Sequence, residues 1–198
     1  RRRMSVIVES DSALRLITKG APLELLAHCA PQGGAEAIAA NDDLAARGYR
    51  VIAVAQRCLD DGLLAAPADL LERELTLVGL IGLYDPPRPE VPEAIRQCHQ
   101  AGIKVTMVTG DYGLTAQAIA RQIGLLDPAA PGQADPVRVI QGDHLDRISD
   151  VQLRQLLKYR TRLVFARMAP EHKLRLVQAY RPLGAVVAVT GDGATDAA

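Results

Sequence analysis

Val108-Thr109-Gly110-Asp111 and Val189-Thr190-Gly191-Asp192 are two copies of one tetrapeptide, and each copy ends an apolar run. The runs, 103–108 and 185–189, are typical of buried β-strands. In parallel α/β sheets, ligands bind outside the carboxyl ends of the strands. The repetition therefore predicts one site built from two strand tips.

The second half of the chain alternates between strand and helix patterns. Strands are predicted over 103–108, 137–140, 163–166 and 185–189, helices over 92–101, 115–123, 151–159 and 170–180, and a proline-rich loop over 127–136. Such alternation is typical of a parallel sheet with right-handed crossovers. We therefore predict an α/β fold with a Rossmann-like parallel sheet.

The first half predicts a small α/β layer with antiparallel strands. A hairpin is expected from 4–8 and 14–18, with further strands over 49–55 and 75–83 and helices over 23–29 and 35–47. Residues 59–72 are loop-like, with a possible short helix. The stretch Asp85-Pro86-Pro87-Arg88-Pro89 stiffens the backbone and removes hydrogen-bond donors, so we place a hinge there. The predicted domains are residues 1–84 and 85–198.

Composition excludes several classes of protein. The formal net charge is zero and Trp is absent, which argues against a nucleic-acid partner. The three cysteines lie far apart, suggest no disulfide framework or zinc site, and fit a reducing cytosol. The longest uncharged apolar run, 75–84, is about half the roughly 18 residues of a membrane-spanning helix. We expect a soluble chain that need not be a whole protein.

The predicted strand ends carry residue types that suit phosphoryl transfer. Hydroxyl and backbone N–H groups hold phosphate oxygens, a lysine offsets their charge, and one or two carboxylates suffice for Mg²⁺. The candidates are Thr109, Gly110, Asp111, Arg167, Lys173, Asp192, Gly193, Thr195 and Asp196. The plainer alternative is that Thr-Gly-Asp is only a strand-to-helix turn, with Asp or Thr as the N-cap.

Taken in order, several segments resemble the P-type cation-transporting ATPases, of the calcium-pump-like branch. The segments are Arg3-Met4-Ser5-Val6, Lys19-Gly20-Ala21-Pro22, and the ranges 48–53, 80–90, 101–111, 164–173 and 190–193. The resemblance covers most of the chain. It implies the C-terminal part of a nucleotide-binding domain in residues 1–84, followed by an incomplete haloacid-dehalogenase-type phosphorylation domain in 85–198.

The resemblance also implies roles for individual residues, with ATP and Mg²⁺ as cofactors. Lys19 of the Lys19-Gly20 motif and Arg50 would bind the nucleotide, while Arg88 lies in the hinge. Thr109 and Gly110 would contact the phosphoryl group, and Lys173 would stabilise its charge. Asp192 would bind Mg²⁺ and Asp196 would support it. Lys19 and Arg50 also fit a simpler interpretation as solvated charges beside turns.

Two departures from the family pattern matter. Thr195 stands where the family has an Asn, and Thr lacks the two donors of an amide. The family's phosphorylated Asp-Lys-Thr-Gly-Thr stretch is absent, and no Asp-x-Asp or Asp-x-Thr replaces it. The nucleophile, an adenine-stacking aromatic residue and the central strand of the sheet would all lie upstream of Arg1.

We therefore expect a cytoplasmic fragment of an integral membrane cation pump, inactive by itself without its nucleophile. Its partners would be ATP and the missing N-terminal part and transmembrane helices of the same polypeptide. Membrane contact would come only through that parent protein. Two alternatives stay open: a stand-alone phosphatase of the haloacid-dehalogenase type, and a catalytically silent nucleotide-binding or regulatory module.

Overall fold

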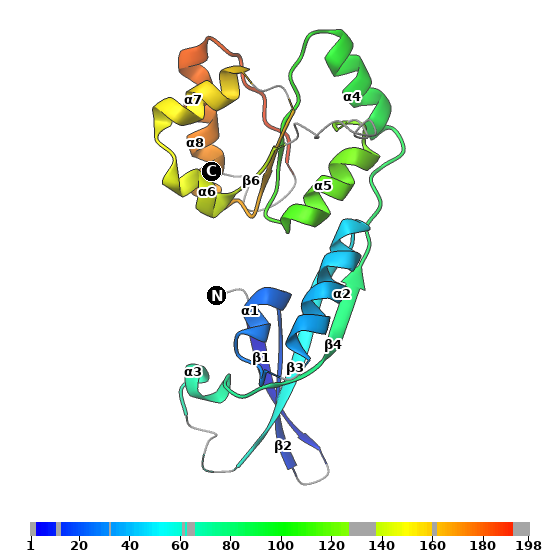
Figure 1. The fold of residues 1–198 in the computed structure, drawn as a ribbon, viewed down its shortest axis with the longest axis vertical. Helices are drawn as coiled ribbons and strands as arrows, with labels where there is room; N and C mark the ends of the chain where they lie inside the picture. Colours follow the sequence, from blue (N-terminus) through cyan, green and yellow to red (C-terminus); the bar gives the residue numbers. More distant parts are fainter. Residues whose placement is uncertain are drawn as a thin grey trace. The chain divides into compact units, whose positions relative to one another are not determined.

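The computed structural model describes residues 3–10, 13–31, 33–60, 62, 66–126, 138–159 and 162–191 (Figure 1). The chain divides into two compact units, Arg1–Asp85 and Pro86–Ala198. The first contains an antiparallel sheet and the second a parallel one. The predicted α/β class, with one sheet of each kind, is confirmed.

Unit 1 is a four-stranded antiparallel sheet in the order β1-β2-β3-β4. Its strands are β1 (Arg3–Ser10), β2 (Ala13–Gly20), β3 (Arg50–Leu59) and β4 (Thr76–Leu83). Its helices are α1 (Pro22–Leu26), α2 (Gly34–Ala46) and α3 (Ala68–Leu71). The predicted hairpin is confirmed as β1 and β2, and the short helix expected within 59–72 is α3.

The core of unit 1 lies on one face of this sheet. Because alternate residues of a strand point to opposite faces, β2 and β3 each bury every second side chain. The buried cluster consists of Leu16, Leu25, Ala53, Ala55, Leu59, Leu71 and Leu75. It draws residues from α1 and α3 as well as from the sheet.

A buried carboxylate links the edge of this sheet to the end of α3. Glu72, only 1% exposed, accepts hydrogen bonds from Arg3 Nε and from Ser5 Oγ at 2.6 Å. The Ser5 and Thr18 hydroxyls lie 2.9 Å apart. A buried charge is tolerated only when it is paired and hydrogen-bonded, so these contacts hold β1 in place.

Unit 2 is built on a parallel sheet in the order β5-β7-β6. The strands are β5 (Met107–Val108), β6 (Arg138–Gln141) and β7 (Leu163–Ala166). The helices are α4 (Val91–Gln100), α5 (Gly113–Gln122), α6 (Gly142–Arg147), α7 (Asp150–Tyr159) and α8 (Pro170–Tyr180), followed by a 3₁₀ turn at Arg181–Leu183.

Helices cover both faces of the parallel sheet, with α4 and α5 on one side and α6, α7 and α8 on the other (Figure 1). All four side chains of β7 are buried. Leu163 and Phe165 pack with the α6–α8 side, whereas Val164 and Ala166 pack with the α4–α5 side. This alternation explains why 163–166 is apolar throughout, as expected of a central parallel strand.

One strand prediction in unit 2 is confirmed only in part, and another is wrong. The run 103–108 forms a strand only at Met107–Val108, because only these two residues pair with β7. Residues 185–190 form no strand and pair with none of the described strands. A β-prone sequence needs a hydrogen-bonded neighbour to become a strand. In the absence of one, Val186 is fully exposed and Val189 is 65% exposed.

The sequence did not predict α6, whose six residues carry little apolar periodicity. Among the described residues, none of the helices is long and apolar enough to cross a membrane.

Candidate functional site

The tips of β5 and β7 are joined by backbone hydrogen bonds. Thr109 N donates to Phe165 O at 2.8 Å, Met168 N donates to Thr109 O at 2.9 Å, and Arg167 N donates to Asp111 O at 2.9 Å. The two loops therefore continue the strand pairing beyond the end of the sheet. Three of the predicted site residues, Thr109, Asp111 and Arg167, are brought together here.

The first Thr-Gly-Asp copy forms a tight local turn. Thr109 Oγ1 donates to Asp111 Oδ2 at 3.1 Å and accepts from Asp111 N at 3.1 Å. The N-cap of α5 is Tyr112, with no side-chain capping bond. Neither Thr109 nor Asp111 occupies the N-cap position, so the alternative in which one of them is the N-cap is wrong for this copy.

Gly110 is exposed at this turn, and the fold does not demand a glycine there. A Cβ at residue 110 would have Met168 O as its nearest neighbour, at an ordinary contact distance of 3.7 Å.

Arg167 occupies an unusual backbone conformation at the end of β7. Its φ of 53° lies in the left-handed region, which non-glycine residues rarely adopt and which concentrates at functional sites. Its guanidinium carbon lies 5.1 Å from the centre of the Tyr112 ring, within cation–π range. This contact adds a side-chain link between the two tips.

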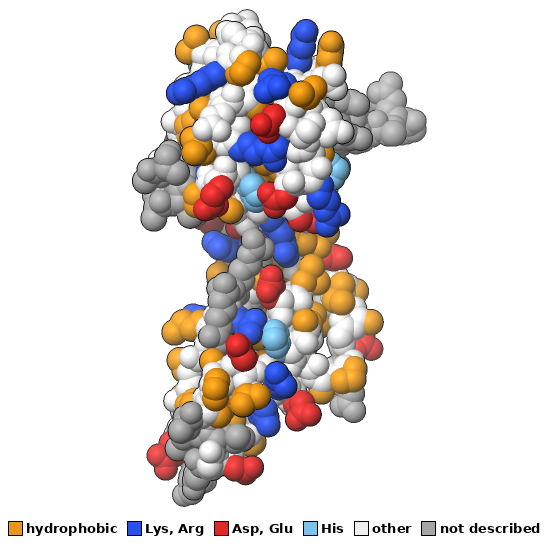
Figure 2. Space-filling view, turned by 90° about the vertical axis from the view of Figure 1, so that its left-hand side faces the viewer, with side chains coloured by type: hydrophobic (Ala, Val, Ile, Leu, Met, Phe, Trp, Pro, Cys, Tyr) orange, Lys and Arg blue, Asp and Glu red, His pale blue; other side chains and the backbone are white. Residues whose placement is uncertain are grey.

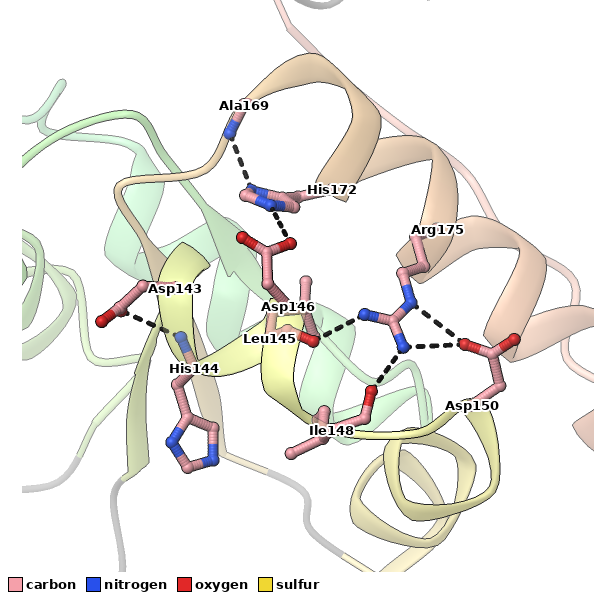
Figure 3. A network of polar contacts seen from close by, with 9 residues as sticks. All are labelled: Asp143, His144, Leu145, Asp146, Ile148, Asp150, Ala169, His172 and Arg175. Atoms are coloured by element: carbon pink, nitrogen blue, oxygen red, sulfur yellow. Dashed lines mark hydrogen bonds and ion pairs between the residues drawn. The ribbon is translucent and has the colours of Figure 1, made fainter.

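The start of α8, which carries Lys173, is built around His172. Pro170 occupies the first turn, where its missing N–H costs nothing. His172 Nδ1 accepts a hydrogen bond from Ala169 N at 3.0 Å, and Nε2 lies 2.9 Å from Asp146 Oδ1 on α6 (Figure 3). Lys173 follows directly and is half-buried. Sequence reasoning missed both His172 and Asp146.

Arg175 fixes α6 against α8 one turn further along. Its guanidinium donates to Leu145 O and Ile148 O, each at 2.6 Å, and to Asp150 Oδ1 at 2.8 and 3.0 Å (Figure 3). It thereby ties the end of α6 and the start of α7 to α8. We call His172, Asp146 and Arg175 the α6–α8 clamp.

The other predicted binding residues lie on unit 1, on the sheet face opposite its core. In the strand register Lys19 pairs with Met4 and Val54, and Arg50 pairs with Leu83. Lys19 and Arg50 are exposed. Apolar side chains share this face, among them Met4 (57% exposed), Ile81 (51%) and Leu83 (48%). We call it the open face of unit 1.

Lys19 and Arg50 stand about 13 Å apart along the sheet, since four residues of β3 separate their rows at about 3.3 Å per residue. The Ile52–Ile81 pair lies in the row between them. Gly20 ends β2 beside Lys19, opposite Ala53.

Of the remaining predicted residues, the structure describes Arg88. Arg88 is exposed in unit 2, where its carbonyl accepts from Val91 N at 3.1 Å. Asp192, Thr195 and Asp196 lie outside the described residues. Over the ranges that the structure covers, no group of three or more His, Cys, Asp or Glu residues is arranged to hold a metal. On the side drawn in Figure 2, Lys and Arg side chains are intermixed with Asp and Glu side chains.

Comparison with known proteins connects both units to one family. Residues 1–90 match the family model described as "P-type ATPase, cytoplasmic domain N". The whole chain is 39% identical to a protein named calcium-transporting ATPase from Bacillus subtilis and 38% identical to the endoplasmic reticulum calcium ATPase srcA of Aspergillus fumigatus. Over 98% of its length it is 38% identical to the sodium/potassium exporting P-type ATPase cta3 of Schizosaccharomyces pombe.

The chain spans about a fifth of the length of these relatives: 22%, 22% and 20%, respectively. The match runs through both units, so it extends beyond the N domain into the region that carries the parallel sheet. The chain therefore belongs to the P-type cation-transporting ATPases and comprises part of their N domain and part of their P domain.

Proposed function

We propose that the chain is the ATP-handling part of a cation pump that forms and hydrolyses an aspartyl-phosphate. Residues 1–84 are the C-terminal part of the nucleotide-binding domain, residues 85–198 are a portion of the phosphorylation domain, and 85–89 is the hinge that carries Arg88. The parent protein is a membrane pump, and this chain is on its cytoplasmic side. The observation that carries the proposal is the joined strand tips at Thr109 and Arg167, with Lys173 in the next helix turn.

The open face of unit 1 supports the nucleotide-binding role. An elongated ligand with an apolar base and a charged phosphate chain needs an apolar surface flanked by cations. Lys19 and Arg50 supply the cations, and the Ile52–Ile81 pair lies in the row between them.

The strand tips of unit 2 support the phosphoryl-transfer role. Thr109 presents a hydroxyl held by Asp111, and Gly110 is a glycine that the fold itself does not require. A backbone without side chains admits a phosphate closely. Lys173 offsets the phosphate charge. Asp192 would bind Mg²⁺, and Asp196 would support that site.

The unpaired run 185–190 fits the same proposal. β5 is an edge strand of the described sheet, and 185–190 has no partner among the described strands. We place the upstream strand, with its nucleophilic aspartate, between these two segments. Catalysis through an aspartyl-phosphate needs that nucleophile, so the 198-residue chain alone binds ATP and Mg²⁺ without turnover.

Titration of the chain with ATP and Mg²⁺ tests the proposal, with NMR shifts reporting the site. ATP should shift signals of the open face. Lys19→Ala and Arg50→Ala should each weaken binding by about tenfold to a hundredfold, because a hydrogen bond to a charged group contributes about 1.5–3 kcal/mol. Lys158→Ala, an exposed lysine on α7, is the matched control and should leave the affinity unchanged.

The alternatives give different results in the same experiment. A stand-alone phosphatase would hydrolyse a phosphate monoester, and a chain with no nucleotide site would show no shifts. Mg²⁺-dependent ATP turnover that Asp192→Asn abolishes would contradict the expected inactivity of the isolated chain.

A further inference from the structure

We propose that His172, in its neutral form with the proton on Nε2, is a positioning residue that sets the first turn of α8 and with it Lys173. The role of Lys173 rests on the function proposed above. The placement of the helix start by His172 rests on the contacts of the ring alone.

The hydrogen bonds of the imidazole define its protonation state. Ala169 N–H is a donor, so Nδ1 must accept and carries no proton. The one proton of a neutral ring is then on Nε2, which donates to Asp146 Oδ1. A second proton on Nδ1 would face the Ala169 N–H and break that bond.

His172 takes the place that Glu or Gln occupies in a capping box. Ala169 is the N-cap of α8 and His172 is the third residue of the helix, from which a side chain reaches back to the N-cap amide. Ala169 has no side chain that could cap the helix in return. In an ordinary capping box the N-cap and N3 side chains both make hydrogen bonds, whereas at the start of α8 only the His172 imidazole can do so.

The α6–α8 clamp holds the ring in this orientation. Asp146 belongs to α6, which Arg175 anchors through Leu145 O and Ile148 O (Figure 3). Asp146 contacts the ring through its carboxylate, and two other carboxylates of α6 and α7 have partners of their own. Asp143 lies 3.7 Å from Arg147 Nη2, and Asp150 is paired with Arg175. Glu171 and Lys173 flank His172 on α8.

The same clamp connects to the strand tips. Met168, the residue before Ala169, donates its amide to Thr109 O, and Arg167 donates to Asp111 O. The hydrogen bond between Ala169 and His172 thus keeps Lys173 at a fixed position relative to Thr109. Without this bond, the first turn of α8, which carries Lys173, can move relative to Thr109.

NMR of the 198-residue chain tests the proposal. Long-range proton–nitrogen correlations should show Nε2 protonated and Nδ1 unprotonated at neutral pH. In His172→Ala, exchange of the Ala169 amide should become about fivefold faster, since one hydrogen bond contributes about 1 kcal/mol. His172→Gln should restore slow exchange, because its amide oxygen accepts from Ala169 N and its amide group donates to Asp146.

A titration with inorganic phosphate then tests whether His172 affects the phosphate site. Binding is measured from the NMR shifts of the Thr109 and Gly110 amides. His172→Ala should weaken binding, while His172→Gln and the exposed α8 control Gln178→Ala should not. A proton on Nδ1, or unchanged Ala169 exchange in His172→Ala, would overturn the positioning role. Unchanged phosphate affinity in that variant would overturn the link to Lys173.

An unmodified chain that gives no phosphate shifts would contradict the proposed function instead. The tautomer and the exchange of the Ala169 amide would still decide whether His172 sets the start of α8.

Discussion

Gly142 lies against His172 so closely that a Cβ at residue 142 would stand 2.7 Å from the imidazole Cε1. The same Cβ would lie 2.6 Å from Arg167 O. Real Cβ atoms do not approach other atoms so closely, so the turn from β6 into α6 needs a glycine for space.

Gly142→Ala should therefore lower the free energy of unfolding of unit 2 by about 1–3 kcal/mol, the usual cost of overpacking. Urea unfolding followed by circular dichroism measures the loss. Gly34→Ala, in α2, is the matched control, because nothing lies within 4 Å of its added Cβ. If Gly142→Ala were as stable as the unmodified chain, the close packing of Gly142 against His172 would be refuted.

Glu72→Ala should destabilise unit 1 by about 3 kcal/mol, because it leaves the Arg3 guanidinium without its buried partner. The Arg3 side chain is 13% exposed and that of Glu72 is 1% exposed. Asp69→Ala is the control: its carboxylate lies 3.9 Å from Arg3 but is 83% exposed. Removing it should change stability by less than about 0.5 kcal/mol. Equal losses in denaturant titrations of the two variants would contradict the prediction.

Arg175→Met should cost about 2–3 kcal/mol, since it removes two charge-assisted bonds to backbone carbonyls as well as an ion pair. Asp150→Asn removes only the ion pair, whose carboxylate is 67% exposed, and should cost about 0.5 kcal/mol. Salt should shrink the Asp150 effect and leave most of the Arg175 effect. Chemical unfolding at low and at high ionic strength measures the stability loss of each variant. If salt reduced the two losses to the same extent, the prediction would be wrong.

Cys29 should react more slowly with iodoacetamide than Cys58 at pH 8. Burial raises the pKa of the Cys29 thiol above its ordinary value of 9.0, and only the thiolate is nucleophilic. Cys29 is half-buried and its Sγ donates to Leu25 O at 3.3 Å, whereas Cys58 is exposed. Peptide mass spectrometry after timed alkylation gives the two rates. If Cys29 were labelled faster than Cys58 in the folded chain, the prediction of a buried thiol with a raised pKa would be wrong.

The raised pKa also predicts how Cys29 affects stability. Because the folded pKa exceeds the unfolded one, its contribution to stability is complete below about pH 9 and is lost as the pH rises through the folded pKa. The free energy of unfolding of Cys29→Ser should therefore fall less at alkaline pH than that of the unmodified chain. If the two pH profiles were the same, the prediction would be wrong.

Much of the fold could be predicted from the sequence because periodicity and turn residues reflect local physics. The fully apolar run 163–166 is the central strand β7, and the Lys19-Gly20 break ends β2. The extent of β5 could not be predicted, because Ile103 is as apolar as Met107 but only Met107 has a partner strand. Strand formation at 185–189 failed for the same reason: pairing is a non-local property.

The convergence of Thr109, Asp111 and Arg167 followed from the rule that parallel strands end at one edge. The His172–Asp146 contact joins residues 26 apart, and the Arg3–Glu72 pair joins residues 69 apart. No local pattern encodes either. His172 gave no signal because a histidine at the third helix position is not among the residues that typically mark a helix start.

Val186 and Val189 project from a chain segment whose backbone pairs with no described strand, and β5 is an edge strand of the described sheet. Unpaired edges and exposed β-branched residues are templates for intermolecular strand addition. Copies of the isolated chain should therefore self-associate through these segments at high concentration. An added peptide that occupies the position between them would act as a solubilising agent, in the way that a donated strand completes an open sheet.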